Sequence, residues 1–200
     1  TGATGFIGKR LVKSLLARKG ATVYFLLRKE SEGKVPELLE YWGVTKARAS
    51  PVFGDLTGKK LGVAADDIKG LKGDIDALFH LAAVYDLMVR REVGLAVNVE
   101  GTRQVLAFAR RCARLERLQY VSTCYVSGRH DGLFLESDLD KGQEFNNFYE
   151  ETKYLAEVEV RGAPRQVDRG KIGHLDLDDG GVQHLLFFRR NPAALGQGVR

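Results

Sequence analysis

The chain has 200 residues, which is enough for one domain of ordinary size with a buried core. Hydrophobic residues make up 44% of the chain and charged residues 28%, a balance typical of globular proteins. No apolar run reaches the length of a membrane span, so the composition argues against a membrane-spanning protein.

The formal net charge is +5 at pH 7, which suits an anionic partner. The densest positive cluster consists of four arginines, Arg110, Arg111, Arg114 and Arg117. Because cations stabilise helix C-termini, this cluster fits a solvated helix end better than a nucleic-acid site. We therefore expect a phosphate-bearing small molecule as the anionic partner and no nucleic acid. The two cysteines, Cys112 and Cys124, form no disulfide framework, which favours a reducing cytoplasm.

Strand and helix signals alternate along the chain, which predicts an α/β fold with a doubly wound parallel sheet. Helices are predicted over residues 6–19, 35–42, 93–113 and 149–161. Strands are predicted over residues 21–27, 49–53, 75–81 and 118–122. The first of these strands, ATVYFLL, is a continuous apolar run, which is typical of a strand buried on both faces.

The two ends of the chain differ from this regular pattern. A glycine turn opens the chain, and such a turn normally follows a strand, so we expect a central first strand to have been cut away before Thr1. Beyond residue 162 the periodicity fades, and residues 182–188 fit either a strand or a short helix. We therefore predict a dinucleotide-binding domain over residues 1–161 and a divergent or truncated tail over residues 162–200.

Gly2, Gly5 and Gly8 are spaced three residues apart and precede a predicted helix. One glycine permits a tight turn, one lets the backbone approach a pyrophosphate, and one lets the helix pack closely on a strand. The helix N-terminus offers unpaired N–H groups and a partial positive charge to the phosphates. The pattern predicts a phosphate-binding turn, with an ordinary glycine turn as the alternative.

Arg28 follows the first predicted strand and lies twenty residues beyond Gly8. An acidic residue near this position accepts hydrogen bonds from the ribose hydroxyls of NAD, whereas an arginine suits the 2′-phosphate of NADP. We therefore predict NADP rather than NAD, although a surface arginine at a strand end is the alternative.

A hydroxyl, a phenol and an ammonium group follow at the spacing that carbonyl chemistry requires. Thr123 ends the strand over 118–122, and Tyr149 and Lys153 follow it, four residues apart on one helical face. A nearby ammonium group favours the phenolate, so Lys153 lowers the pKa of Tyr149 toward a useful range, and it is placed to hold the nicotinamide ribose. The Thr123 hydroxyl then stabilises a carbonyl oxygen. The alternatives to these assignments are Ser122 for the hydroxyl and Tyr125 or Tyr154 for the phenol.

These patterns resemble the extended short-chain dehydrogenase/reductase superfamily over about residues 1–161. The motifs that carry the resemblance occur in the family's order: TGATGFIG, GDL, HLAA, NVEGT, YVST and YEETK. The resemblance implies that Asp55 and the backbone of Leu56 bind adenine, and that Ala82 and Ala83 let the backbone approach the adenosine. It implies no catalytic role for His80, and it makes Asn98 a structural tie to a neighbouring strand.

Together, the motifs and the resemblance give a complete candidate site that includes no metal. Its catalytic members are Thr123, Tyr149 and Lys153. Its cofactor-binding members are Gly2, Thr4, Gly5, Phe6, Ile7, Gly8, Arg28, Asp55, Leu56, Ala82, Ala83 and Lys153.

The segment from Val126 to Glu150 is most similar to the thioester reductase and fatty acyl-CoA reductase branch of the superfamily. This similarity implies NADP-dependent reduction of an acyl thioester to an aldehyde. A sugar-nucleotide epimerase or dehydratase and a hydroxysteroid dehydrogenase are alternatives with another substrate. A binding protein that senses NADP without turnover is an alternative of another class. The oligomeric state is open.

Overall fold

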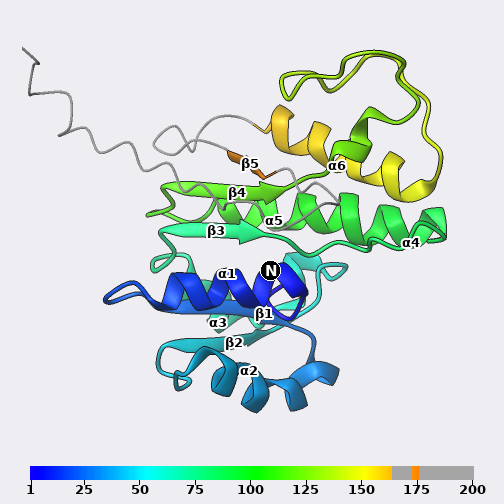
Figure 1. Cartoon of the computed structure of the whole chain (residues 1–200). Helices are drawn as coiled ribbons and strands as arrows, with labels where there is room; N and C mark the ends of the chain where they lie inside the picture. Colours follow the sequence, from blue (N-terminus) through cyan, green and yellow to red (C-terminus); the bar gives the residue numbers. More distant parts are fainter. Residues whose placement is uncertain (164–172, 176–200) are drawn as a thin grey trace, which may run out of the picture.

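Parallel strands alternate with helices along the chain, as the sequence predicts (Figure 1). The computed structural model describes residues 1–163 and 173–175. The helices are α1 (Phe6–Leu16), α2 (Val35–Trp42), α3 (Ala65–Leu71), α4 (Arg91–Gly94), α5 (Gly101–Ala109) and α6 (Phe148–Gly162). The strands are β1 (Val23–Leu27), β2 (Ala49–Phe53), β3 (Ala77–His80), β4 (Arg117–Val121) and β5 (Gly173–Leu175). Short helical turns complete the described part: η1 (Lys29–Lys34), η2 (Lys59–Gly62), η3 (Leu95–Glu100) and η4 (Cys124–Ser127).

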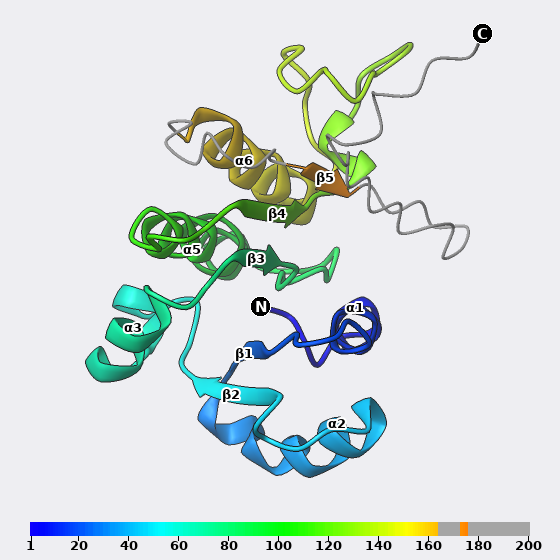
Figure 2. The same ribbon diagram turned by 90° about the vertical axis from the view of Figure 1, so that its left-hand side faces the viewer.

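The described strands form two sheets in which every pair is parallel. β1 pairs with β2, and β3, β4 and β5 form the second sheet in that order. Figure 2 shows the strands edge-on, with α1 and α2 on one side and α3, α5 and α6 on the other. This doubly wound arrangement confirms the predicted fold class.

Two apolar clusters hold the helices on the strands. In the first, Phe25 of β1 meets Trp42 of α2 edge-to-face, with ring centroids 5.2 Å apart. In the second, Leu106 of α5 and Val160 of α6 pack against Leu118 of β4. The second cluster fixes α6 on the sheet that carries the predicted catalytic residues.

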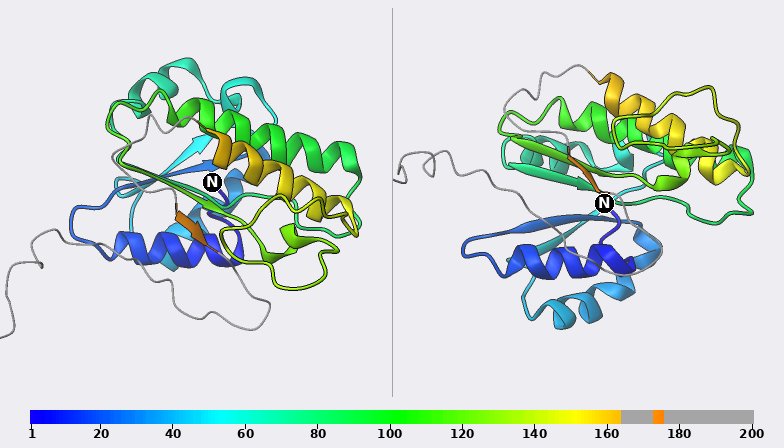
Figure 3. Two further views of the ribbon diagram at one scale, coloured as in Figure 1. Left: turned by 90° about the horizontal axis from the view of Figure 1, so that it is seen from above. Right: turned by 45° about the horizontal axis from the view of Figure 1, so that its top comes forward.

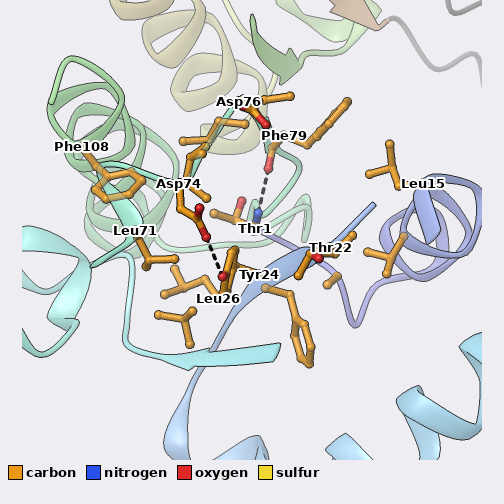
Figure 4. A pocket seen from close by; sticks show the side chains of 18 of the residues that line it. Thr1, Leu15, Thr22, Tyr24, Leu26, Leu71, Asp74, Asp76, Phe79 and Phe108 are labelled. Atoms are coloured by element: carbon orange, nitrogen blue, oxygen red, sulfur yellow. Dashed lines mark hydrogen bonds between the residues drawn. The ribbon is translucent and has the colours of Figure 1, made fainter. Parts of the chain in front are cut away.

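A cavity of about 570 Å³ separates β1 from β3 (Figure 4). The amino terminus lies between the two sheets (Figures 1 and 2, and the right-hand view of Figure 3), and the Thr1 ammonium donates to the Phe79 carbonyl oxygen at 2.7 Å. Across the cavity, the Tyr24 hydroxyl donates to Asp74 at 2.8 Å. The expected burial of β1 on both faces is therefore wrong for Tyr24, which stays 37% exposed because the cavity adjoins it.

Three further elements differ from the sequence-based expectation. The helix predicted over residues 93–113 consists of α4, the π-helical turn η3 and α5, and it ends at Ala109. The short helix α3 lacks a long apolar period, and the pattern did not predict it. β5 lies beyond the predicted boundary at residue 161, yet it pairs with β4. The undecided segment 182–188 lies outside the described residues.

Within residues 1–163 and 173–175, no helix combines the length and the apolar character needed to cross a membrane.

We predict that a short Val/Ile-rich extension before Thr1 stabilises the chain by pairing with both β1 and β3. Each buried polar group that gains a hydrogen-bond partner raises the free energy of unfolding by roughly 1–3 kcal/mol. A gain of a few kcal/mol raises the Tm of a domain of this size by about 5–10 °C. Thermal unfolding with and without the extension measures the effect. A Gly/Ser extension of equal length is the control, and equal Tm values for all three chains would contradict the prediction.

Candidate functional site

The predicted site residues gather where the parallel strands end. Arg28 follows β1, Asp55 follows β2, Ala82 follows β3 and Thr123 follows β4. The carboxyl ends of parallel strands meet at one edge of a sheet, which is where open α/β folds bind their ligands. The fold therefore places residues that are distant in the sequence along one edge.

The glycine turn has the close packing that its sequence predicts. Gly2 has a φ of +76°, and a Cβ there would lie 2.8 Å from the Ala82 nitrogen. A Cβ at Gly8 would lie 1.9 Å from the Gly2 carbonyl oxygen. Neither position accepts a side chain, because backbone atoms occupy the space. The turn is thereby pressed against both α1 and the end of β3.

The N-terminus of α1 is open to an anion. Gly5 is its N-cap and makes no side-chain cap, and the first turn contains no acidic residue. Thr4, Gly5 and Phe6 are exposed, and Ile7 is half-buried. A Cβ at Gly5 would meet only the Gly2 carbonyl oxygen, so the backbone there is accessible from outside. This turn fits a pyrophosphate, because helix N-termini attract anions through their N–H groups and dipole.

The adenosine side of the predicted site combines a cation with a carboxylate. Asp55 Oδ1 accepts from the Thr57 hydroxyl at 2.7 Å and from its N–H at 2.8 Å. These bonds, with a smaller contribution from the charge of Arg28, lower the pKa of Asp55. The Asp55 carboxylate thus organises a turn, and its Oδ2 remains an acceptor. Arg28 is exposed, and Leu56 is buried against Gly101.

His80 is buried and hydrogen-bonded to two threonine hydroxyls. The ring is buried between Thr1 Oγ1, 2.7 Å from Nδ1, and Thr102 Oγ1, 3.0 Å from Nε2. Burial lowers the pKa of His80 well below its ordinary value. The imidazole is therefore neutral near pH 7.

Asn98 ties three segments together from the π-helical turn η3. Its Oδ1 accepts from the Val84 N–H at 2.8 Å, and its Nδ2 donates to the Val84 carbonyl oxygen at 3.0 Å. The same Nδ2 donates to Thr152 Oγ1 at 3.0 Å. The tie runs to the loop after β3 and not to the strand itself, and it extends to α6, one residue before Lys153.

The start of α6 is determined by polar side chains. Asn147 is the N-cap, and its Oδ1 accepts from the Glu150 N–H at 3.0 Å. The buried Glu150 carboxylate accepts from the N–H and amide nitrogen of Asn146. These bonds fix the helical turn that carries Tyr149.

Lys153 is buried against the end of β4. Its Nζ donates to the Tyr120 hydroxyl and to the Val121 carbonyl oxygen, both at 2.7 Å, and only 4% of the residue is exposed. Burial lowers the pKa of Lys153 to about 7, and the negative charge of Glu157 opposes that shift. Burial also raises the pKa of Tyr120. Tyr120 belongs to the YVST motif, but no sequence signal marks it as the partner of the lysine.

The two hydroxyl candidates have different surroundings. Thr123 is buried, and its Oγ1 accepts from the Tyr125 N–H at 3.3 Å, which leaves its own O–H as a donor. The Ser122 hydroxyl donates to the Glu157 carboxylate. The geometry therefore favours Thr123 over Ser122 as the group that meets a substrate.

The three tyrosines also differ. Tyr149 is half-buried on α6, and its ring centroid lies 6.4 Å from that of Tyr125. The Tyr154 ring packs on Phe145 at 5.0 Å. Burial raises the pKa of Tyr154, and the charge of Asp140 and a hydrogen bond to it add to this shift. Tyr149 shares α6 with Lys153, one helical turn before it.

Comparison with known proteins gives relatives that match across most of this chain. The model of the male sterility protein family matches residues 1–170. A chloroplastic fatty acyl-CoA reductase 2 of Arabidopsis thaliana is 25% identical over 211 residues, 89% of this chain and 34% of the relative. A 3-beta-hydroxysteroid dehydrogenase of Mycolicibacterium neoaurum is 34% identical over 170 residues, 81% of this chain and 42% of the relative.

The fold is shared with a solved reductase domain. The terminal R domain from the myxalamid PKS-NRPS biosynthetic pathway superposes with a TM-score of 0.71 at 31% identity. The match covers 88% of this chain and 46% of that domain. This chain therefore spans less than half of each of these three proteins.

The glycine turn and the doubly wound parallel sheet define a Rossmann domain that binds a nicotinamide dinucleotide. The chain belongs to the male sterility protein family, within the extended short-chain dehydrogenase/reductase superfamily. The predicted resemblance is thus confirmed.

The buried ammonium of Lys153 predicts a specific pH dependence of stability. An unfolded lysine titrates near 10.5 and the folded Lys153 near 7, so between these values the unfolded chain binds more protons. The contribution of Lys153 to the free energy of unfolding of the chain therefore rises with pH over this window, by up to about 1.4 kcal/mol per pH unit.

Lys153→Met should remove this contribution, and denaturant unfolding between pH 7 and pH 9 measures it. Lys69→Met, at an exposed position of α3, is the control and should keep the wild-type slope. An unchanged slope in Lys153→Met would show that the folded lysine is not neutralised in this range.

Proposed function

We propose that this domain binds NADP(H) and, within its full-length protein, reduces an acyl thioester to an aldehyde. The observation that carries the proposal is the placement of Lys153 on α6, against the end of β4 and one helical turn from Tyr149, near the strand end that carries Thr123. The names of the relatives support the substrate class, since they include a fatty acyl-CoA reductase and a reductase domain of a PKS-NRPS pathway.

Bound NADPH supplies a hydride to the carbonyl carbon of the thioester. The Thr123 O–H donates to the carbonyl oxygen and stabilises the negative charge that develops there. The Tyr149 hydroxyl donates to the same oxygen, and the Lys153 ammonium favours the phenolate form. When the carbonyl re-forms, the C–S bond breaks, the thiolate leaves and takes up one proton from solvent, and the aldehyde remains.

Arg28 supports the choice of NADP over NAD. It is exposed directly after β1, and its charge acts on Asp55 after β2. A guanidinium in this position pairs well with a phosphate on the adenosine ribose. Asp55, with its Oδ2 available, is proposed to accept from the adenine edge.

The second candidate keeps the cofactor and changes the substrate. The relative from Mycolicibacterium neoaurum favours a hydroxysteroid, because it is 34% identical to this chain. A panel of acyl-CoA, hydroxysteroid and UDP-sugar substrates, followed through NADPH absorbance in the full-length protein, distinguishes the two candidates. The same panel would reveal a sugar-nucleotide enzyme, and NADPH binding without turnover of any substrate would indicate a sensor.

A reducing compartment also belongs to the proposal. Cys112 is buried, Cys124 is exposed, and neither forms a disulfide within the part of the chain that the structure describes. We infer a cytoplasmic location from these thiols, whereas the Arabidopsis relative is chloroplastic. Fluorescent tagging of the full-length protein in its own cells tests this inference.

Arg28→Ala should weaken NADPH binding by about 10- to 100-fold, because it removes a charge-assisted contact worth about 1.5–3 kcal/mol. NADH binding should stay within about twofold, since NADH lacks the 2′-phosphate. Titration of both cofactors by fluorescence measures the change. Lys29→Ala, next in the chain and ion-paired with Glu32, is the matched control. Equal affinity of the wild type for both cofactors would contradict the assignment.

Tyr149→Phe in the full-length enzyme should lower kcat by about 10²–10⁴-fold, because proton transfer by a positioned side chain contributes that much. The Tm and the NADPH affinity should change little. Tyr125→Phe and Tyr154→Phe are the controls and should keep most of the activity. Near-normal turnover in Tyr149→Phe would move the phenol role to one of those two tyrosines.

A further inference from the structure

Glu157 is a buried carboxylate with no role in the proposed hydride transfer. It lies on α6, one helical turn after Lys153, and only 3% of it is exposed. It accepts from the Ser122 hydroxyl at the end of β4. Arg161, one turn further on, donates to it from Nε at 2.9 Å and from a terminal nitrogen at 2.6 Å.

The ion pair is buried on one side only, because 28% of the Arg161 side chain is exposed and solvent screens its charge. Here the cation is also shared: Arg161 donates to the carbonyl oxygens of Glu136, Ser137 and Asp138. Glu157 thus stands between the loop before α6 and the strand end at Ser122.

The contact with Ser122 ties the helix to the predicted catalytic hydroxyl. Ser122 immediately precedes Thr123, and both are buried. A bond from Glu157 to Ser122 therefore fixes the backbone that carries Thr123 relative to the helix that carries Lys153. A displacement of about 1 Å between such groups is enough to lower a rate about 100-fold.

The second effect of Glu157 is electrostatic. The titratable groups around Lys153 are Tyr120 on β4, Tyr149 on α6 and, behind Tyr120, His80 on β3. Tyr120 and His80 are neutral near pH 7, so they do not balance an ammonium charge. Glu157 is the group whose negative charge favours the protonated lysine.

We propose that Glu157 is a positioning residue, which keeps Lys153 in its ammonium form and fixes the strand end that carries Thr123. This role rests on the proposed thioester reduction for its effect on turnover. The electrostatic interaction between Glu157 and Lys153 does not depend on which substrate the enzyme reduces. The two claims are therefore tested by separate measurements.

The first measurement is the pH profile of kcat/KM in the full-length enzyme. Glu157→Gln keeps the size of the side chain and an acceptor for Ser122, but it removes the charge. The ammonium form of Lys153 is lost as the pH rises, so a lower lysine pKa moves the alkaline limb to lower pH. We expect a shift of about one unit, with activity about tenfold lower at pH 8 and within about threefold of wild type at pH 6.

Two variants make this profile specific. Glu157→Asp keeps the charge, so its alkaline limb should stay at the wild-type position even if kcat falls. Glu159→Gln removes the half-exposed partner of Arg103 on the same helix and should leave the profile unchanged. If kcat/KM of Glu157→Gln fell by the same factor at every pH, the proposal would be overturned, because a merely structural role predicts that result.

The second measurement needs no substrate. A double-mutant cycle measures the coupling between Glu157 and Lys153. Denaturant unfolding is recorded at pH 6 and pH 9 for the full chain, Glu157→Gln, Lys153→Met and the double variant. We expect a coupling of about tenfold in the unfolding equilibrium constant at pH 6, where Lys153 is charged, and little at pH 9. Equal coupling at both pH values would overturn the electrostatic link.

The two measurements separate the possible failures. If the wild type reduces no thioester, the proposed function is wrong. The unfolding measurements still test the interaction between Glu157 and Lys153 in that case. If Glu157→Gln does not fold because Arg161 is left unpaired, Glu157→Gln with Arg161→Met removes both charges and takes its place in each experiment.

Discussion

The burial of one ammonium group, that of Lys153, is the constraint on which the rest of the site depends. An isolated cation in the interior is costly, and Lys153 is tolerated because Tyr120 and the Val121 carbonyl oxygen accept from it. These contacts press α6 onto the end of β4. The Asn98–Thr152 bond ties the same helix to η3, and the Asn147 cap fixes where the helix begins. The helix position is therefore determined by polar contacts as well as by apolar packing.

The same constraint is compatible with the proposed contact between Lys153 and the nicotinamide ribose. An ammonium group has three N–H donors, and Tyr120 and Val121 use two of them. The third donor is the one that the proposed contact with a ribose hydroxyl would use. A lysine fixed by two bonds loses little conformational entropy when it makes the third, so the rigid arrangement favours binding.

The sequence predicted the parts of the molecule that depend on local patterns. The helix from Phe6, the strand ends at Arg28 and Thr123, and the Tyr149–Lys153 pair are all set by short-range spacing. Contacts between distant segments left no such signal: Tyr120 sits in an ordinary strand pattern, and only the folded arrangement brings it to Lys153. Glu157 lies one helical turn after Lys153, but its contact with Ser122 depends on the fold. β5 and α3 were missed because three or seven residues are too few to show a period.

The cavity between β1 and β3 divides the predicted cofactor site into two halves. Arg28 and Asp55 belong to the sheet of β1 and β2, whereas Thr123 and Lys153 belong to the sheet of β3 and β4. A dinucleotide has to contact both halves at once, so its affinity depends on how firmly they are joined. The glycine turn joins them through close backbone packing on Ala82 and α1. A strand that pairs with both β1 and β3 would make the two halves one rigid sheet, and it should therefore tighten NADPH binding as well as raise the Tm.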